Sequence, residues 1–144
     1  MKNIIDLSLL FEKGRLFLSN HILTMDNEFN FKRMVVWQKA MQFASLAIDI
    51  TEQLDTQKCY FKLIDQIQGA SASVPQNIAE GKGRATDKDF AKFLAYSRGS
   101  LYETLTLVNL FYMKKWISKE KLNELESLGE EVVKMINGLL VRLR

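Results

Sequence analysis

Residues 118–143 read SKEKLNELESLGEEVVKMINGLLVRL, a stretch whose apolar positions recur alternately three and four residues apart. Such a seam follows one face of an α-helix and is the pattern by which long helices pack side by side. Ser118 is the expected N-cap, and Glu120 in the first turn offsets the positive end of the helix dipole. The stretch therefore predicts one long amphipathic helix. Its seam consists of Leu122, Leu125, Gly129, Val132, Ile136, Leu139 and Leu143.

Three further stretches upstream carry the same helical period, over residues 31–54, 59–80 and 87–115. The first and third are apolar on more than one side, whereas a single four-helix core uses one face of each helix. No stretch alternates with period two, so no strand is expected. Four long helices joined by short loops predict an all-α, up-down-up-down four-helix bundle. The surplus apolar faces favour its assembly into a homo-oligomer. In the first helix the two stripes are Val36, Ala40, Phe43, Ala47, Ile50 and Leu54, and Trp37, Met41, Ala44, Ile48 and Thr51.

Glycine, proline and capping residues mark the expected helix boundaries. Gly81 is expected to stop the second helix as the residue after its C-cap, and Thr86 to cap the third helix. Pro75 lies inside the second helix, where a missing backbone hydrogen bond predicts a kink or local irregularity. Gly99 in the third helix is expected to lie where a neighbouring helix approaches closely.

Length and charge divide the chain into two expected parts. The 144 residues suit one domain, with residues 31–144 as the bundle and residues 1–30 as a partly ordered or disordered N-terminal extension. The whole chain carries a net charge of +3, and the excess of Lys and Arg lies in the bundle. No apolar run is long enough to span a bilayer, so no membrane partner is expected. A single free cysteine and no cleavable signal favour a cytoplasmic protein.

Residues able to carry catalysis are few. The chain has one histidine, His21, and one cysteine, Cys59, and neither has a catalytic partner nearby in the sequence. A lone histidine also argues against a multi-histidine metal site. The glycine-rich run at residues 81–84 lacks the Ser or Thr that follows the lysine of a phosphate-binding loop. We therefore expect a protein that is not an enzyme, with no cofactor, metal or small-molecule substrate.

Two sets of polar residues remain as candidates for function. A basic set could contact a nucleic-acid backbone if its members converge, although the aromatic residues typical of single-strand binders are not evident among them. A second set is expected to form a structural network around Pro75, because buried polar groups need hydrogen-bond partners. The basic set is Lys82, Arg84, Lys88, Lys92 and Arg98, and the network set is Gln66, Ser73, Asn77, Glu80, Arg84 and Glu103.

The motifs in the middle of the chain resemble those of a known family. Residues 73–81 read SVPQNIAEG, and Gly83-Arg84 and Gly99-Ser100-Leu101 follow, with Glu103 beyond; residues 36–40 read VWQKA. This pattern resembles the bacterial four helix bundle proteins, first named for reading frames in intervening sequences of 23S ribosomal RNA genes. The resemblance covers about residues 31–144. It implies a bundle that assembles into a ring, commonly a pentamer, and a relation to the accessory protein of diversity-generating retroelements.

These observations support one leading hypothesis and two alternatives. The leading hypothesis is a non-enzymatic, homo-oligomeric helical bundle that binds RNA or a nucleoprotein partner. The first alternative is a structural or protein-interaction ring with no affinity for nucleic acid. The second is a retroelement accessory protein that binds a reverse transcriptase, which the modest net charge of +3 makes the weaker interpretation.

Overall fold

A computed structural model of the chain describes residues 29–55 and 60–144. The chain divides between Asn30 and Phe31, and the second unit, Phe31–Arg144, contains all the α-helices described below. The predictions for residues 1–28, including His21, lie outside the described residues, and so does Cys59.

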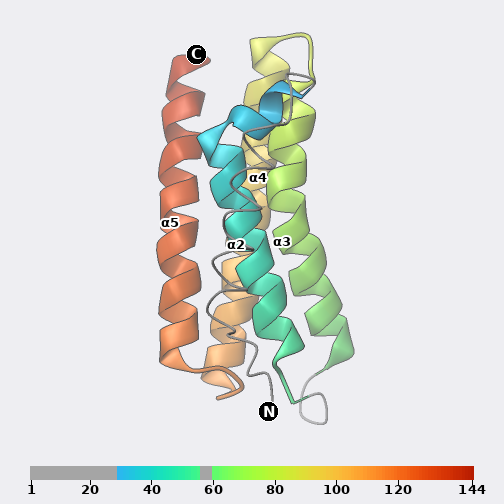
Figure 1. Cartoon of the computed structure of the whole chain (residues 1–144), viewed down its shortest axis with the longest axis vertical. Helices are drawn as coiled ribbons and strands as arrows, with labels where there is room; N and C mark the ends of the chain where they lie inside the picture. Colours follow the sequence, from blue (N-terminus) through green and yellow to red (C-terminus); the bar gives the residue numbers. More distant parts are fainter. Residues whose placement is uncertain (1–28, 56–59) are drawn as a thin grey trace, which may run out of the picture. The chain divides into compact units, whose positions relative to one another are not determined.

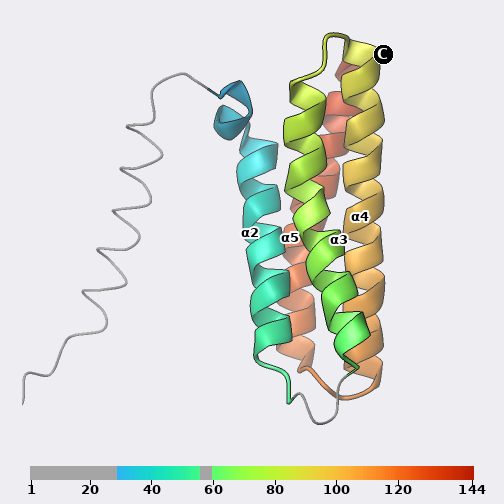
Figure 2. The same cartoon turned by 90° about the vertical axis from the view of Figure 1, so that its right-hand side faces the viewer.

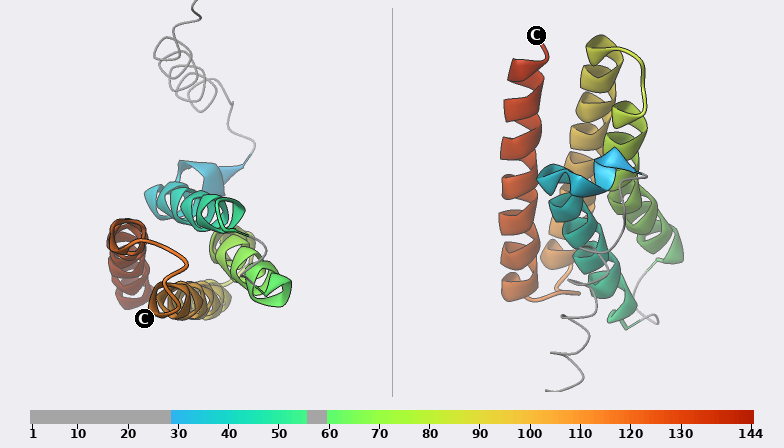
Figure 3. Two further views of the ribbon diagram at one scale, coloured as in Figure 1. Left: turned by 90° about the horizontal axis from the view of Figure 1, so that it is seen from below. Right: turned by 45° about the horizontal axis from the view of Figure 1, so that its top comes forward.

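The bundle unit is built from four long α-helices. A short 3-10 helix, η1 (Asn30–Arg33), precedes α2 (Val35–Glu52), α3 (Phe61–Lys82), α4 (Asp87–Met113) and α5 (Lys119–Arg142). The four run alternately up and down, and seen end-on they occupy the corners of a square (Figures 1, 2 and 3). Each packs against its sequence neighbours, and α5 closes the bundle against α2. No strand occurs among the described residues, so the predicted all-α four-helix bundle is confirmed.

The predicted apolar seams form the core. Every member of the first α2 stripe is buried, and in α5 the seam is buried from Leu122 to Ile136 before Leu139 and Leu143 become half-buried near the chain end. The second α2 stripe divides, since Ala44 and Thr51 are buried while Met41 remains 44% exposed. Part of the surplus apolar face predicted for α2 therefore lies on the outside of the bundle.

The prediction that Gly81 ends the second helix is wrong. α3 continues to Lys82 and is capped at Gly83, whose φ of −80° is an ordinary right-handed value. Gly81 is buried inside the last turn, and a Cβ there would lie 2.6 Å from Phe93 Cβ. Glycine is needed at this position because α4 crosses too closely for a side chain, and not because the backbone turns there. The prediction that a neighbouring helix approaches Gly99 closely is also wrong within the chain, because a Cβ at Gly99 would meet nothing within 4 Å.

Pro75 does not interrupt α3, whose helical assignment is continuous from Phe61 to Lys82. The proline is buried, and one residue before it the Val74 carbonyl accepts a hydrogen bond of 2.8 Å from the buried Ser97 hydroxyl of α4. A proline removes only one backbone donor, and packing on both sides keeps the rest of the helix in place. The local irregularity predicted at this proline is therefore absent from the secondary structure, whereas the predicted kink, a change in the direction of the helix axis, stays a prediction.

The two predicted N-caps are confirmed. The Thr86 hydroxyl accepts a hydrogen bond from the Asp89 backbone N–H at 3.1 Å, and the Ser118 hydroxyl accepts one from the Lys121 backbone N–H at 3.3 Å. Because each cap satisfies a backbone donor at the first turn, each fixes where its helix starts. These caps begin the two helices, α4 and α5, that follow the shortest loops.

Candidate nucleic-acid interface

Charge is separated between the two ends of the bundle. We call the end that holds the α3–α4 turn and the C-terminus the basic end, and define it as residues 31–43, 72–100 and 131–144 (Figure 2). It carries 11 basic and 4 acidic side chains, a net of +7. The opposite, acidic end comprises residues 44–55, 60–71 and 101–130, with 5 basic and 9 acidic side chains, a net of −4. The chain's modest net charge of +3 thus hides a marked separation of charge between the two ends of the bundle.

The structure places four of the five predicted basic residues around the α3–α4 turn. Lys82, Arg84, Lys88 and Lys92 are exposed. Arg98 is half-buried on the α5 side of α4, where its Nη1 donates a 2.6 Å hydrogen bond to Asn137 Oδ1. The predicted set therefore separates into a cluster at the turn and one arginine held against α5.

Aromatic rings lie between the cations of this cluster. The Arg84 guanidinium carbon is 4.6 Å from the centre of the Phe93 ring, which meets the Tyr96 ring edge-on at 5.7 Å. The Lys92 ammonium lies 5.8 Å from the centre of the Tyr96 ring. We call these four side chains the cation–aromatic row. Beside it, the Lys82 ammonium lies 5.7 Å from the centre of the Phe90 ring.

This arrangement corrects the expectation that no aromatic residues interleave with the basic set. Both rings belong to the stretch 87–115, for which the sequence predicts more than one apolar side, but Phe93 is only half-buried and Tyr96 is 49% exposed. The i, i+4 spacing of Lys92 and Tyr96 on one helix was a signal available in the sequence. The contact of Arg84 with Phe93 could not be predicted from the sequence, because it depends on how the turn brings Arg84 against α4.

The predicted polar network forms three separate groups. Gln66 Nε2 donates to Glu103 Oε1 at 3.3 Å, which links α3 to α4. A second link joins the Ser73 and Ser100 hydroxyls at 3.0 Å, and the third group is the ion pair of Glu80 with Arg84. Asn77 belongs to the second group, since its Nδ2 donates to both the Ser73 carbonyl and hydroxyl oxygens at 2.8 Å.

The Ser73 group is half-buried between α3 and α4, whereas the Gln66–Glu103 and Glu80–Arg84 pairs are exposed. The fully buried polar contact near Pro75 is instead made by Ser97, which sequence reasoning did not single out. Ser97 occurs among apolar core positions of α4, and a small hydroxyl at such a position is the one available signal for it.

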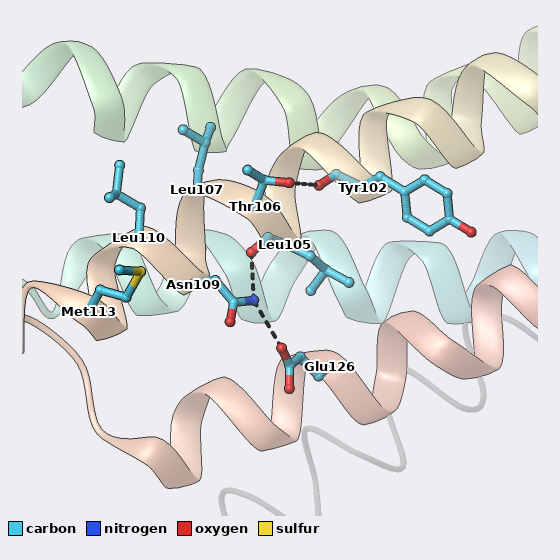
Figure 4. A pocket seen from close by; sticks show the side chains of 8 residues that line it. All are labelled: Tyr102, Leu105, Thr106, Leu107, Asn109, Leu110, Met113 and Glu126. Carbon is cyan, nitrogen blue, oxygen red and sulfur yellow. Dashed lines mark hydrogen bonds between the residues drawn. The ribbon is translucent and has the colours of Figure 1, made fainter.

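A shallow hollow of about 660 Å³ lies on the outer side of the C-terminal half of α4 (Figure 4). Tyr102, Leu110 and Met113 line it and are 50%, 36% and 76% exposed. At its α5 edge, Asn109 Nδ2 donates to Glu126 Oε1 at 2.9 Å. The hollow is mainly apolar and belongs to the acidic half of the bundle, away from the cation–aromatic row.

Two further searches of the described residues give negative results. No three His, Cys, Asp or Glu side chains gather there as a possible set of metal ligands. Within residues 29–55 and 60–144, no helix combines the length and the apolar character needed to cross a membrane.

Comparison with known proteins identifies the family. The family model described as 23S rRNA-intervening sequence protein matches residues 32–138. The chain belongs to this family. The resemblance inferred from the motifs is therefore confirmed. No curated protein matches the chain.

A solved structure supports the fold of this family member. The chain is similar to a protein of unknown function from the S23 ribosomal protein family of Bacteroides thetaiotaomicron, with a TM-score of 0.69 and 22% identity. The similarity covers 74% of this chain and 98% of that one. At this identity the likeness establishes the shared helical fold. The family match includes the whole cation–aromatic row and the hollow on α4, whereas Arg142 and Arg144 lie beyond it.

Proposed function

We propose that this member of the 23S rRNA-intervening sequence protein family is a non-enzymatic, homo-oligomeric bundle that binds RNA through its basic end. The observation that carries the proposal is the charge separation, a net of +7 at one end against −4 at the other. Phosphate contacts by Lys and Arg supply most of the affinity of sequence-independent RNA binding. The exposed lysines around the α3–α4 turn are free of the core and suit such contacts.

Self-association is the second part of the proposal, with a second copy of the chain as the partner of the exposed apolar faces. A closed ring needs two different patches on each copy, because its interfaces are head-to-tail. The outer face of α4 offers Tyr102, Leu110 and Met113, and the start and outer side of α2 offer Val35 and Met41, which are 58% and 44% exposed. The ring size suggested by the family resemblance, commonly a pentamer, fits this two-patch arrangement.

The second candidate function is a protein-interaction ring without affinity for nucleic acid. It is favoured by the hollow on α4, whose mainly apolar lining suits a protein surface better than a phosphate backbone. A nucleoprotein partner, such as a reverse transcriptase bound to RNA, would contact the basic end and the hollow on α4 at once. In each case the proposed setting is the cytoplasm.

Light scattering behind size exclusion, at low and high salt, tests the proposal. The ratio of absorbance at 260 and 280 nm is followed across the peak. We expect the mass of a ring, with nucleic acid that co-elutes at low salt and is stripped at high salt. A ring free of nucleic acid at every salt concentration, and unable to bind added structured RNA, would favour the protein-interaction ring. A monomer would contradict the self-association.

A further inference from the structure

The cation–aromatic row has the chemistry of a single-strand binding surface. We infer that Tyr96 stacks against an unpaired base of RNA while Arg84, Lys88 and Lys92 hold the flanking phosphates. This inference rests on the proposed function and specifies its ligand as single-stranded RNA. The alternatives, duplex RNA and an acidic protein, become outcomes of the test.

The exposure of Tyr96 makes its ring available to a ligand. The residue is 49% exposed, and the Phe93 ring of the same helix lies beside it. Phe93 meets it at an interplanar angle of 85°, which fixes the ring without covering it by stacking. A fixed, half-exposed aromatic ring loses little conformational freedom when a base stacks on it.

The cations around Tyr96 are placed for a backbone that passes beside the ring. Lys92 lies at the Tyr96 ring, and Lys88 is one helical turn earlier on the exposed surface of α4. Arg84 reaches Phe93 from the turn, so positive charge stands on both sides of the two rings. Alternation of cations with aromatic faces is how proteins bind single strands with little dependence on sequence.

Stacking distinguishes a single strand from a duplex. In a duplex the base faces are covered by their neighbours, and proteins recognise RNA duplexes through shape, phosphates and 2′-hydroxyls. A solvent-exposed ring therefore contributes only where a base is unpaired. Lysines and arginines alone would bind either form.

The opposite end supplies a matched control within the same chain. The Lys119 ammonium lies 5.0 Å from the centre of the Tyr112 ring, and Tyr112 is 37% exposed. Lysines 114 and 115 adjoin it, so the local chemistry is similar, but the surrounding half of the bundle carries a net of −4. Among the described residues, only Tyr96 combines an exposed aromatic ring with the basic end.

Fluorescence anisotropy with the full chain tests the inference. The probes are a labelled, unstructured RNA of roughly 12 nucleotides and its perfect duplex, a length within the range that one single-strand module covers. We expect Tyr96→Leu to weaken single-strand binding roughly 5- to 100-fold, the usual effect of removing one stacking partner. Duplex binding should change less than about twofold, since phosphate contacts remain. Tyr96→Phe should bind like the wild type, and Tyr112→Leu should leave both probes unaffected.

The outcomes separate this inference from the function on which it rests. If the wild type binds RNA but Tyr96→Leu binds the single strand equally well, the inference fails and the proposed function stands. An equal loss for both probes, or a larger loss in Tyr112→Leu, also overturns it. If the wild type binds neither probe, both fail. Light scattering of each variant completes the test, because a changed mass in Tyr96→Leu would place Tyr96 between copies and contradict the RNA contact.

Discussion

The two ends of the bundle close their helix pairs in different ways. At the acidic end, α4 ends at Met113, and Lys115 follows its C-cap with a left-handed φ of 61°. The Lys115 backbone N–H donates to the Tyr112 carbonyl oxygen, and the Trp116 N–H donates to that of Phe111. The Phe111 and Trp116 rings pack at 5.0 Å, which completes a Schellman motif. At the basic end, the turn after α3 contains Gly83 but uses no positive φ.

This difference indicates that the turn does not fix how α3 and α4 meet at the basic end. Its turn residues, from Gly83 to Thr86, are all exposed, whereas Trp116 and Ile117 of the other turn are at least half-buried. Exposed turn residues make few contacts with the core. Charged and aromatic side chains can therefore be accommodated there with little loss of stability. The close approach of Gly81 to α4 fixes the basic end instead.

The largest expected effect comes from reversing charge at one end. The triple variant Arg84→Glu, Lys88→Glu and Lys92→Glu should weaken RNA binding at low salt by at least roughly tenfold. It should also reduce the slope of log K against log salt by about three, one for each phosphate contact removed. Anisotropy titrations over a range of salt concentrations measure both quantities.

A charge-matched variant at the acidic end is the control. Lys114→Glu, Lys115→Glu and Lys119→Glu change the net charge by the same amount and alter a cluster of similar density. If binding depends on the basic end, this variant keeps most of its affinity and its salt slope. Equal losses in the two triples would show that total charge matters and that the ends are equivalent.

The next effect in size concerns the helix crossing at the basic end. A Cβ at Gly81 would lie 2.6 Å from Phe93 Cβ and 2.9 Å from Phe90 Cδ2. Gly81→Ala should therefore lower the free energy of unfolding by about 1–3 kcal/mol, the usual cost of overpacking. Urea unfolding followed by circular dichroism measures the change.

Gly69→Ala and Gly99→Ala provide the opposite expectation. Both glycines are exposed inside helices, and a Cβ at either would meet nothing within 4 Å. In each variant the free energy of unfolding should rise by about 0.5–1 kcal/mol, because alanine loses less backbone entropy than glycine when a helix forms. A loss of assembly in either variant would instead locate that glycine between copies.

These glycines show how far sequence reasoning reached. The helix count, the core stripes and the N-caps Thr86 and Ser118 follow from spacing and local hydrogen bonding, which act within a few residues. The sequence predicted a helix end at Gly81 and a close helix contact at Gly99, yet the close contact is at Gly81 and Gly99 is open. The packing at a glycine depends on the position of another helix, which local spacing does not encode. The cation–aromatic row likewise depends on tertiary structure, since the contact between Arg84 and Phe93 crosses a turn.

A smaller effect is expected from exchanging the turn chemistry of the two ends. Lys115→Gly should raise the free energy of unfolding by about 1 kcal/mol, because glycine adopts a left-handed φ without the penalty that lysine bears. Gly83→Ala should raise the free energy of unfolding by about 0.4–1 kcal/mol. The φ of Gly83 is an ordinary right-handed value, and an added Cβ would come no closer than 3.4 Å, to the Glu80 carbonyl oxygen. Denaturant midpoints of the two single variants measure both changes. A loss of stability in Lys115→Gly would mean that the lysine side chain itself supports the turn.

The smallest expected effect is that of the Glu80–Arg84 ion pair. Its side chains are 54% and 46% exposed, so the coupling energy from a double-mutant cycle should be about 0.2–1 kcal/mol. Arg84→Ala should cost slightly more than Glu80→Ala, because it also loses the contact with Phe93. A coupling energy well above this range would mean that the ion pair fixes the conformation of the turn.

The Glu130–Lys134 pair has the same spacing and is the reference for this measurement. Its hydrogen bond and the charge of Lys134 lower the pKa of the Glu130 carboxyl. A lowered folded-state pKa stabilises the fold above the ordinary glutamate pKa, and this contribution disappears as the pH falls through the lowered value. The stability difference between the wild type and Lys134→Met should therefore be present at neutral pH and vanish in acid. Because the Glu130 side chain is 67% exposed, salt should reduce this difference. The contact of Arg84 with Phe93 should persist at high salt, so the Glu80–Arg84 pair should be the less salt-sensitive of the two pairs.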